Sequence, residues 1–119
     1  MARKNRNKNK NNIVARFDRY FGEGNLEDWQ RLCSDIFEDW ELATRDITSK
    51  TKCRKLLKTV FVNIRDLLDA VESSPKRKPQ RFGSHAALKD YTKQTRRFYP
   101  KEKVKDELGP ARALLRRIL

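Results

Sequence analysis

Apolar residues recur at intervals of three and four along most of the chain, which is the period of one face of an α-helix. Four segments follow this pattern: 13–21, 25–40, 49–72 and 84–98. A shorter apolar stripe begins after the Gly109–Pro110 pair. No segment sustains the apolar/polar alternation of a half-buried strand. We therefore predict an all-α fold, a small irregular bundle of four to six helices.

Capping residues mark the ends of these helices. Asn25 and Ser84 each precede an apolar stripe and are expected to cap the helix that follows. Gly22 and Gly24 are expected to end the first helix, because glycine tolerates the left-handed conformation found at helix ends. These residues therefore support the helix boundaries that the periodicity suggests.

The longest predicted helix runs from Ser49 to about Glu72. Its charges oppose the helix dipole, because five cations lie between Lys50 and Lys58 and three acids between Asp66 and Glu72. Local helix stability does not explain this order. We therefore expect the cations to serve a binding partner or the acidic helix 25–41.

The positive charge is unevenly distributed. The 119 residues carry 29 Lys and Arg against 16 Asp and Glu, a net charge of +13. Residues 1–12 contribute +5, residues 13–47 contribute −5, residues 48–74 contribute +3 and residues 75–119 contribute +10. The acidic segment either pairs with the basic C-terminal third or points away while the basic face meets a polyanion, and the sequence leaves both arrangements open.

The first twelve residues are low in complexity and consist mainly of Asn, Lys and Arg. They contain almost nothing to bury, so we predict a disordered basic tail at residues 1–12, followed by one helical domain at residues 13–119. This segment also lacks the apolar core of a secretory signal. No apolar run reaches the ~20 residues of a membrane span, so we expect an intracellular protein with no membrane partner.

No catalytic constellation is visible. His85 is the single histidine, and with Cys33 and Cys53 it makes three candidate zinc ligands where a structural site needs four. Both cysteines lie on apolar stripes, so we expect them to be small buried residues. There is no glycine-rich phosphate loop. We therefore expect a non-enzymatic protein with no metal and no cofactor.

Three basic features are candidates for contact with nucleic acid: the tail, the loop around Pro75–Pro79 and the cations of helix 84–98. Lysine and arginine neutralise phosphates and release counterions, and short basic clusters are also typical of nuclear import signals. The candidate nucleic-acid-binding residues are Arg3, Lys4, Arg6, Lys8, Lys10, Lys76, Arg77, Lys78, Arg81, Lys89, Lys93, Arg96 and Arg97.

Two further features belong to the same region. Ser74 precedes Pro75 and is a candidate proline-directed phosphorylation site, where a phosphate would offset about two of the loop's charges. The helical spacing of Tyr91 and Phe98 predicts that both belong to the core, and Tyr99 is expected to be the exposed aromatic residue.

Several motifs stand out: Cys53-x-x-Leu56-Leu57-x-x-Val60-x-Val62-Asn63-Ile64-x-Asp66-Leu67, Phe82-x-Ser84-x-x-x-Leu88-x-x-Tyr91-Thr92, Phe98-Tyr99-Pro100-Lys101 and Leu114-Leu115-Arg116. Together they resemble a small domain that recurs in uncharacterised proteins of filamentous fungi. The resemblance covers roughly residues 17–119 and implies a compact helical domain, with no activity attached to it. Within these motifs, Asn63 lies between apolar neighbours and is expected to make a structural hydrogen bond.

Two functions of different classes follow from these features. The first is a non-enzymatic nucleic-acid-associated protein that contacts the phosphate backbone of RNA or DNA with little sequence readout, and a nuclear location is one expectation for it. The second is a protein-interaction module whose acidic and basic faces dock a partner or a second copy, with self-association through helix 25–41. A basic face remote from helix 25–41 favours the first function. An exposed tryptophan or phenylalanine favours the second.

Overall fold

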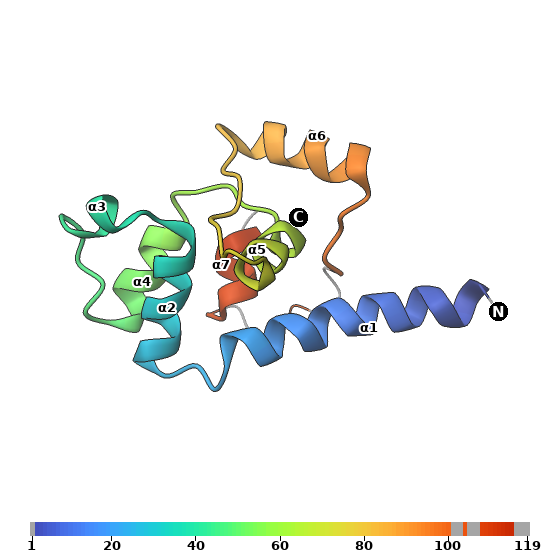
Figure 1. Ribbon diagram of the computed structural model, residues 1–119, viewed down its shortest axis with the longest axis horizontal. Coiled ribbons are helices and arrows are strands. Elements are labelled where there is room, and N and C mark those ends of the chain that lie inside the picture. Colours follow the sequence, from blue (N-terminus) through green and yellow to red (C-terminus); the bar gives the residue numbers. More distant parts are fainter. Residues whose placement is uncertain (1, 101–103, 105–107, 116–119) are drawn as a thin grey trace.

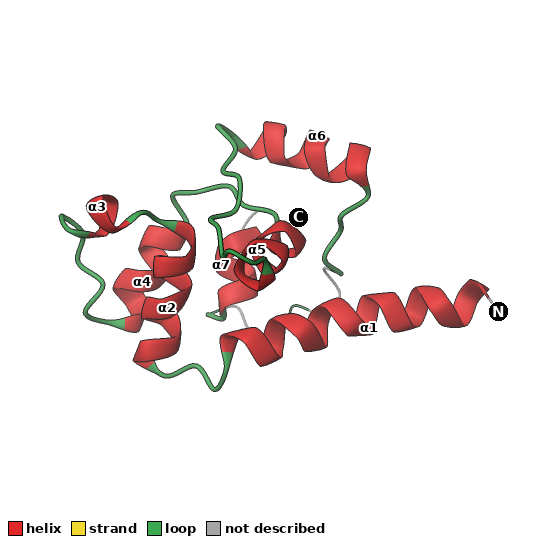
Figure 2. Cartoon of the chain, viewed as in Figure 1, coloured by secondary structure: helices red, strands yellow, loops and turns green. Residues whose placement is uncertain are grey.

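Helices and loops make up the part of the chain that the computed structural model describes, namely the backbone of residues 2–100, 104 and 108–115, with side chains from residue 12 onward (Figures 1 and 2). The helices are α1 (Ala2–Phe21), α2 (Leu26–Ile36), α3 (Asp39–Leu42), α4 (Lys50–Leu57), α5 (Ile64–Glu72), α6 (His85–Thr95) and α7 (Pro110–Leu115). One isolated antiparallel bridge joins Phe61 to Phe82. The predicted all-α fold is confirmed.

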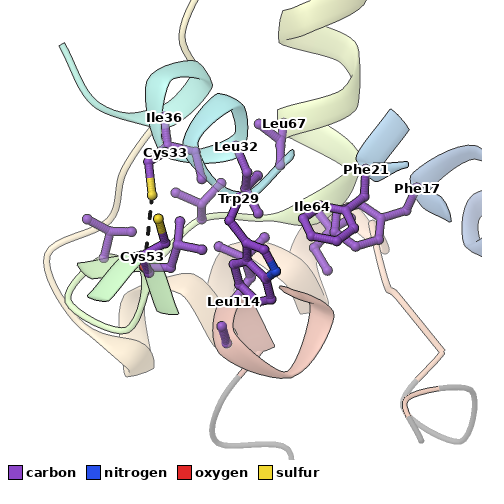
Figure 3. Packing of buried hydrophobic residues seen from close by; sticks show 14 of the residues in the cluster. Phe17, Phe21, Trp29, Leu32, Cys33, Ile36, Cys53, Ile64, Leu67 and Leu114 are labelled. Atoms are coloured by element: carbon purple, nitrogen blue, oxygen red, sulfur yellow. Dashed lines mark hydrogen bonds between the residues drawn. The ribbon is translucent and has the colours of Figure 1, made fainter. Parts of the chain in front are cut away.

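The core forms where α2 packs on α4, α1 packs on α5 and α7 packs on α4 (Figure 1). Its largest completely buried side chains include Phe17, Leu32, Ile36, Leu57, Ile64, Leu67, Leu68 and Leu114. Both cysteines lie in this core as predicted, and Figure 3 shows the Cys33 thiol directed at the carbonyl oxygen of Cys53, 3.9 Å away. Burial raises the pKa of the Cys33 thiol, which keeps it protonated.

The predicted caps are confirmed. Asn25 caps α2 by accepting a hydrogen bond from the backbone N–H of Asp28, and the Asp28 side chain accepts one in return from the N–H of Asn25. Ser84 caps α6 by accepting from the N–H of Ala87. Gly22 follows the end of α1 with φ +96°, a conformation that favours glycine.

The single helix predicted over 49–72 is wrong, because the chain forms α4 and α5 with a break at residues 58–63. Asn63 starts α5 by accepting from the N–H of Asp66, which competes with continuation of the first helix. The break also explains part of the order of charges, although Lys50 and Lys52 still lie in the first turn of α4. Asp66 lies in the first turn of α5, whereas Arg54 and Lys55 lie in the last turn of α4, and both placements suit the helix dipoles.

The helix predicted over 25–40 also ends early, at Ile36. Phe37 turns to an extended conformation and still reaches the core, and a new short helix, α3, starts after Glu38. This break rotates Trp40 away from the face it would share with Trp29. Trp40 is 74% exposed whereas Trp29 is buried, so the prediction of one stripe containing both is wrong.

Helix α1 begins at Ala2, eleven residues before the predicted start at Ile13. Ile13, Phe17 and Phe21 are buried against the other helices, while the N-terminal half of α1 projects beyond them (Figure 1). The disorder expected of residues 1–12 in solution stays a prediction.

The exposures of Phe98 and Tyr99, which follow α6, are the reverse of those predicted. The Tyr99 ring packs edge-on against Phe17, with centroids 6.0 Å apart, whereas Phe98 is 49% exposed. The cause is the early end of α6 at Thr95, which changes the direction of the chain before Phe98. The apolar stripe predicted after Gly109–Pro110 forms α7 as far as Leu115, and the rest of that stripe and residues 101–103 and 105–107 lie outside the described residues.

Candidate nucleic-acid interface

The basic loop after α5 is turned onto the acidic helix α2. Lys76 Nζ lies 2.6 Å from Asp35 Oδ1, and the Asp35 side chain is only 5% exposed. The other oxygen of this carboxylate accepts a 2.6 Å hydrogen bond from the Tyr20 hydroxyl of α1. Lys78 Nζ donates to the carbonyl oxygen of Ser34. Two of the predicted phosphate-binding lysines therefore hold the loop against α2.

Arg81 makes the same kind of contact with α3. Its Nη1 lies 3.0 Å from Glu41 Oε2, and its guanidinium stacks over the Phe37 ring, 5.3 Å from the centroid. A hydrogen bond from the backbone N–H of Glu38, together with the Arg81 contact, holds the pKa of Glu41 below its usual value. The question left open by the sequence is thus settled in part, because the 76–81 loop contacts Ser34, Asp35 and Glu41 of the acidic segment.

Arg97 is committed to α5. Its guanidinium donates to both Asp66 and Asp69, and Arg16 of α1 reaches Asp69 and Glu72 at 2.8 Å from the other side. Burial alone would raise the pKa of Asp69, but the hydrogen bonds from Arg16 and Arg97 lower it overall. Arg97 therefore belongs to an ion-pair network that joins α1 and α5 to the segment after α6.

Helix α6 lies at the edge of the fold and has no buried residue (Figure 1). Its inner face is held by the Tyr91 ring against Phe82, with centroids 4.8 Å apart, and by the Thr92 hydroxyl, which accepts from Asn63 Nδ2 at 3.3 Å. Asn63 also donates to the carbonyl oxygen of Arg97 at 2.8 Å, which confirms its predicted structural role. Apart from the half-buried His85 and Leu88, the rest of α6 faces solvent.

The exposed side of α6 carries a row of cations, Lys89, Lys93 and Arg96. They are spaced i, i+4 and i+7, which places them within about 60° of each other around the helix and along roughly 10 Å of its length. None of the three has an acidic partner among the described side chains, although Asp90 lies beside the row on the same helix. We call Lys89, Lys93 and Arg96 the α6 row.

Arg96 has a feature that the sequence pattern does not reveal. It ends α6 with φ +58°, the left-handed conformation that glycine usually supplies at a helix end. For an arginine this conformation costs roughly 1 kcal/mol or more. Neither its spacing nor its neighbours in the sequence signal this geometry.

Arg77 lines an open cleft of about 530 Å³. Lys78, Tyr91 of α6 and the ion-paired Asp66, Asp69 and Arg97 also line this cleft. Arg77 is exposed, and its guanidinium has no acceptor in the part of the chain that the structure describes. It is therefore the one candidate of the 76–81 loop whose side chain is not docked on α2 or α3.

The five candidates of the tail, Arg3, Lys4, Arg6, Lys8 and Lys10, all belong to the projecting half of α1. Only their backbone is described, so the structure places them on this helical segment and shows nothing of their contacts. The thirteen candidates thus fall into three groups. Five are on the tail, four are docked on acidic or carbonyl groups of the same chain, and four are exposed around α6 and the cleft.

No group of three or more His, Cys, Asp and Glu side chains among the described residues is placed to hold a metal ion. Searching the same residues shows no helix with the length and apolar character needed to cross a membrane. The comparisons with known proteins found no matching family model, no matching curated protein and no matching solved structure. The resemblance to a fungal domain therefore rests on the sequence motifs alone.

Proposed function

We propose that this protein is a non-enzymatic nucleic-acid-binding protein that contacts the phosphate backbone through the basic tail, the α6 row and Arg77. Lysine and arginine in these positions gain affinity by neutralising phosphates and releasing counterions, with little readout of base sequence. The proposed location includes the nucleus, because nucleic acid is present there.

The observation that carries the proposal is the separation of the cations into docked and exposed groups. Lys76, Lys78, Arg81 and Arg97 are held by acceptors of the same chain, while the α6 row faces solvent on a helix with no buried residue. A cation that already holds a carboxylate gains little from a phosphate, because it must first give up that partner. The exposed cations carry no such cost, so the proposal assigns phosphate contact to them and not to the docked four.

The fold also pairs several acidic side chains with basic side chains of the same chain, although Arg77 shares its cleft with Asp66 and Asp69. Asp28, Asp35, Glu41, Asp66, Asp69 and Glu72 each lie within 3.1 Å of a basic side chain of the same chain or are hydrogen-bonded to one. Internal pairing of this kind weakens the negative electrostatic potential that the acidic side chains produce around the protein. The positive field of the tail and of the α6 row is correspondingly less opposed.

The test is a binding measurement with the full chain and short labelled single-stranded RNA, single-stranded DNA and duplex DNA over a salt series. We expect log affinity to fall linearly with log salt, with a slope of about 0.7–0.9 for each phosphate contact. Changing the five tail cations to glutamine in the full-length chain should make the slope shallower. Absence of binding to all three probes at about 50 mM salt would overturn the proposal.

A second candidate function, protein interaction, is favoured by one specific observation. Trp40 is 74% exposed on α3, and exposed tryptophan is enriched in the energetically important positions of protein interfaces. Sedimentation of the chain over a concentration series, with Trp40→Ala as the comparison, tests the self-association form of this candidate. A dimer that the substitution dissociates supports it, and a monomer at every concentration removes it.

A further inference from the structure

The turn that follows α5 presents a serine to solvent beside a cluster of cations. It contains Ser74, Pro75, Lys76 and Arg77, all of which are exposed. We propose that Ser74 is a phosphorylation site for a proline-directed serine/threonine kinase, and that Arg77 holds the resulting phosphate. This inference goes beyond nucleic-acid binding and does not depend on it.

The Ser74 hydroxyl is available for the reaction. It makes no hydrogen bond within the described part of the chain, whereas the neighbouring Ser73 hydroxyl donates to the carbonyl oxygen of Ala70 at 2.7 Å. A serine followed by proline and then by basic residues is the sequence that proline-directed kinases favour. Ser74, Pro75, Lys76 and Arg77 supply that order on the surface of the fold.

The reaction needs Mg-ATP as the phosphoryl donor. Ser74 Oγ forms a bond to the γ-phosphorus while the bond from that phosphorus to the β–γ bridging oxygen breaks and ADP leaves. The hydroxyl proton passes to the base of the kinase. The product carries about −1.5 to −2 charge at Ser74, three residues before Arg77.

Arg77 is the favoured partner of this phosphate because it lies three residues after Ser74 in the same turn and is exposed. The backbone N–H of Arg77 donates to the carbonyl oxygen of Ala70 at 3.1 Å, which closes the turn that contains Ser74. The Arg77 guanidinium has no competing acceptor among the described side chains and can bind phosphate with two parallel hydrogen bonds. It would then be withdrawn from the cleft that it shares with α6.

Lys76 is the less favourable partner, because it is already paired with Asp35. Removing Lys76 would leave a carboxylate that is only 5% exposed without its counter-charge. The other anions near this turn are Glu72 at the end of α5, Glu38, and Asp39 at the start of α3, and they repel a phosphate rather than hold it. The loop should therefore stay docked on α2 after phosphorylation.

The experiment uses the full chain, a proline-directed kinase and Mg-ATP, with Ser74→Ala as the control. Mass spectrometry should show one phosphoryl group at Ser74 and none there in the control. Phosphorus NMR then follows the second ionisation of the phosphate, whose pKa is about 6 when it is unpaired. We expect a lower pKa in the phosphorylated wild type than in Arg77→Gln, and a smaller difference for Lys76→Gln.

Two results would overturn the inference. If a peptide of residues 70–80 accepts phosphate and the folded chain does not, the fold blocks the site. If Arg77→Gln leaves the phosphate titration unchanged, Arg77 does not hold the phosphate. Neither measurement involves nucleic acid, so its outcome is separate from that of the binding test.

Discussion

Lys76 Nζ and Asp35 Oδ1 are 2.6 Å apart, and this contact joins the basic loop after α5 to the acidic helix α2. The two partners differ in exposure, since the Lys76 side chain is 56% exposed and the Asp35 side chain is 5% exposed. The acid is thus the buried partner, and the lysine can return to solvent if the pair is broken. The contact takes Lys76 out of the set of cations available to a polyanion.

This asymmetry predicts unequal effects of breaking the pair. Among the described side chains, Lys76→Met leaves the buried Asp35 carboxylate with the Tyr20 hydroxyl as its remaining partner, so we expect a loss of about 1–2 kcal/mol in the free energy of unfolding. Asp35→Asn returns Lys76 to solvent and keeps an acceptor for Tyr20, so we expect a loss below about 1 kcal/mol. Urea denaturation of both single variants and the double variant measures these values. Equal losses in the two single variants would contradict the assignment of Asp35 as the critical charge.

Gly22 is expected to be intolerant of a side chain. Its φ is +96°, and a Cβ atom there would lie 3.0 Å from both carboxylate oxygens of Asp28. Gly22→Ala should therefore destabilise the fold by about 2 kcal/mol. Gly83→Ala is the matched control, because no atom lies within 4 Å of a Cβ at that position. Thermal unfolding followed by circular dichroism should show a large shift for the first variant and almost none for the second.

Two substitutions at Arg96 can separate an effect on the free energy of unfolding from an effect on nucleic-acid affinity. Arg96→Gly relieves the left-handed backbone at φ +58°, so it should raise the free energy of unfolding by about 1 kcal/mol relative to Arg96→Ala. Both variants lose the same cation and should lose the same affinity for nucleic acid. Denaturation and binding curves for the two variants check this pair of expectations. An affinity that followed stability, rather than charge, would count against a phosphate contact by Arg96.

The paired carboxylates predict acid sensitivity. Hydrogen bonds from Lys52 and Thr48 lower the pKa of Asp46 to about 2, and contacts with Arg16 and Arg97 outweigh burial to lower the pKa of Asp69. The unfolded chain binds protons at its ordinary carboxylate pKa of about 4, so it holds more protons than the folded chain between pH 4 and pH 2. The stabilisation that these carboxylates provide should therefore be present above pH 4, and the free energy of unfolding should fall as the pH drops toward 2. Urea midpoints against pH, with Asp69→Asn giving a shallower fall, measure this effect.

The fold class followed from the sequence because helical periodicity is a local property. Asn25 and Ser84 were identified as caps, since a capping side chain acts within three residues of its own position. The break between α4 and α5 was missed because Asn63 interrupts an otherwise continuous apolar stripe. The cap at Asn63 and the bridge from Phe61 to Phe82 determine where the helix breaks. The bridge pairs two residues that are far apart in the chain.

The candidate interface was predictable only in part. Composition identified the basic residues, but it could not separate Lys76 and Arg81, which bind acids of α2 and α3, from Lys89 and Lys93, which do not. That division arises from the return of the loop across α2, a tertiary contact with no local signal. For the same reason the exposed aromatic residue was expected at Tyr99, although the end of α6 at Thr95 leaves Phe98 exposed instead.

The most direct measurement compares the salt dependence of nucleic-acid binding in two triple variants of the full chain, Lys89→Gln/Lys93→Gln/Arg96→Gln and Lys76→Gln/Lys78→Gln/Arg81→Gln. Each removes three positive charges, and circular dichroism confirms that each is folded. We predict that the first variant reduces the slope of log affinity against log salt by about 2–3, while the second leaves it nearly unchanged. A reduced slope in the second variant, with the wild-type slope in the first, would contradict the assignment of phosphate contact to the α6 row.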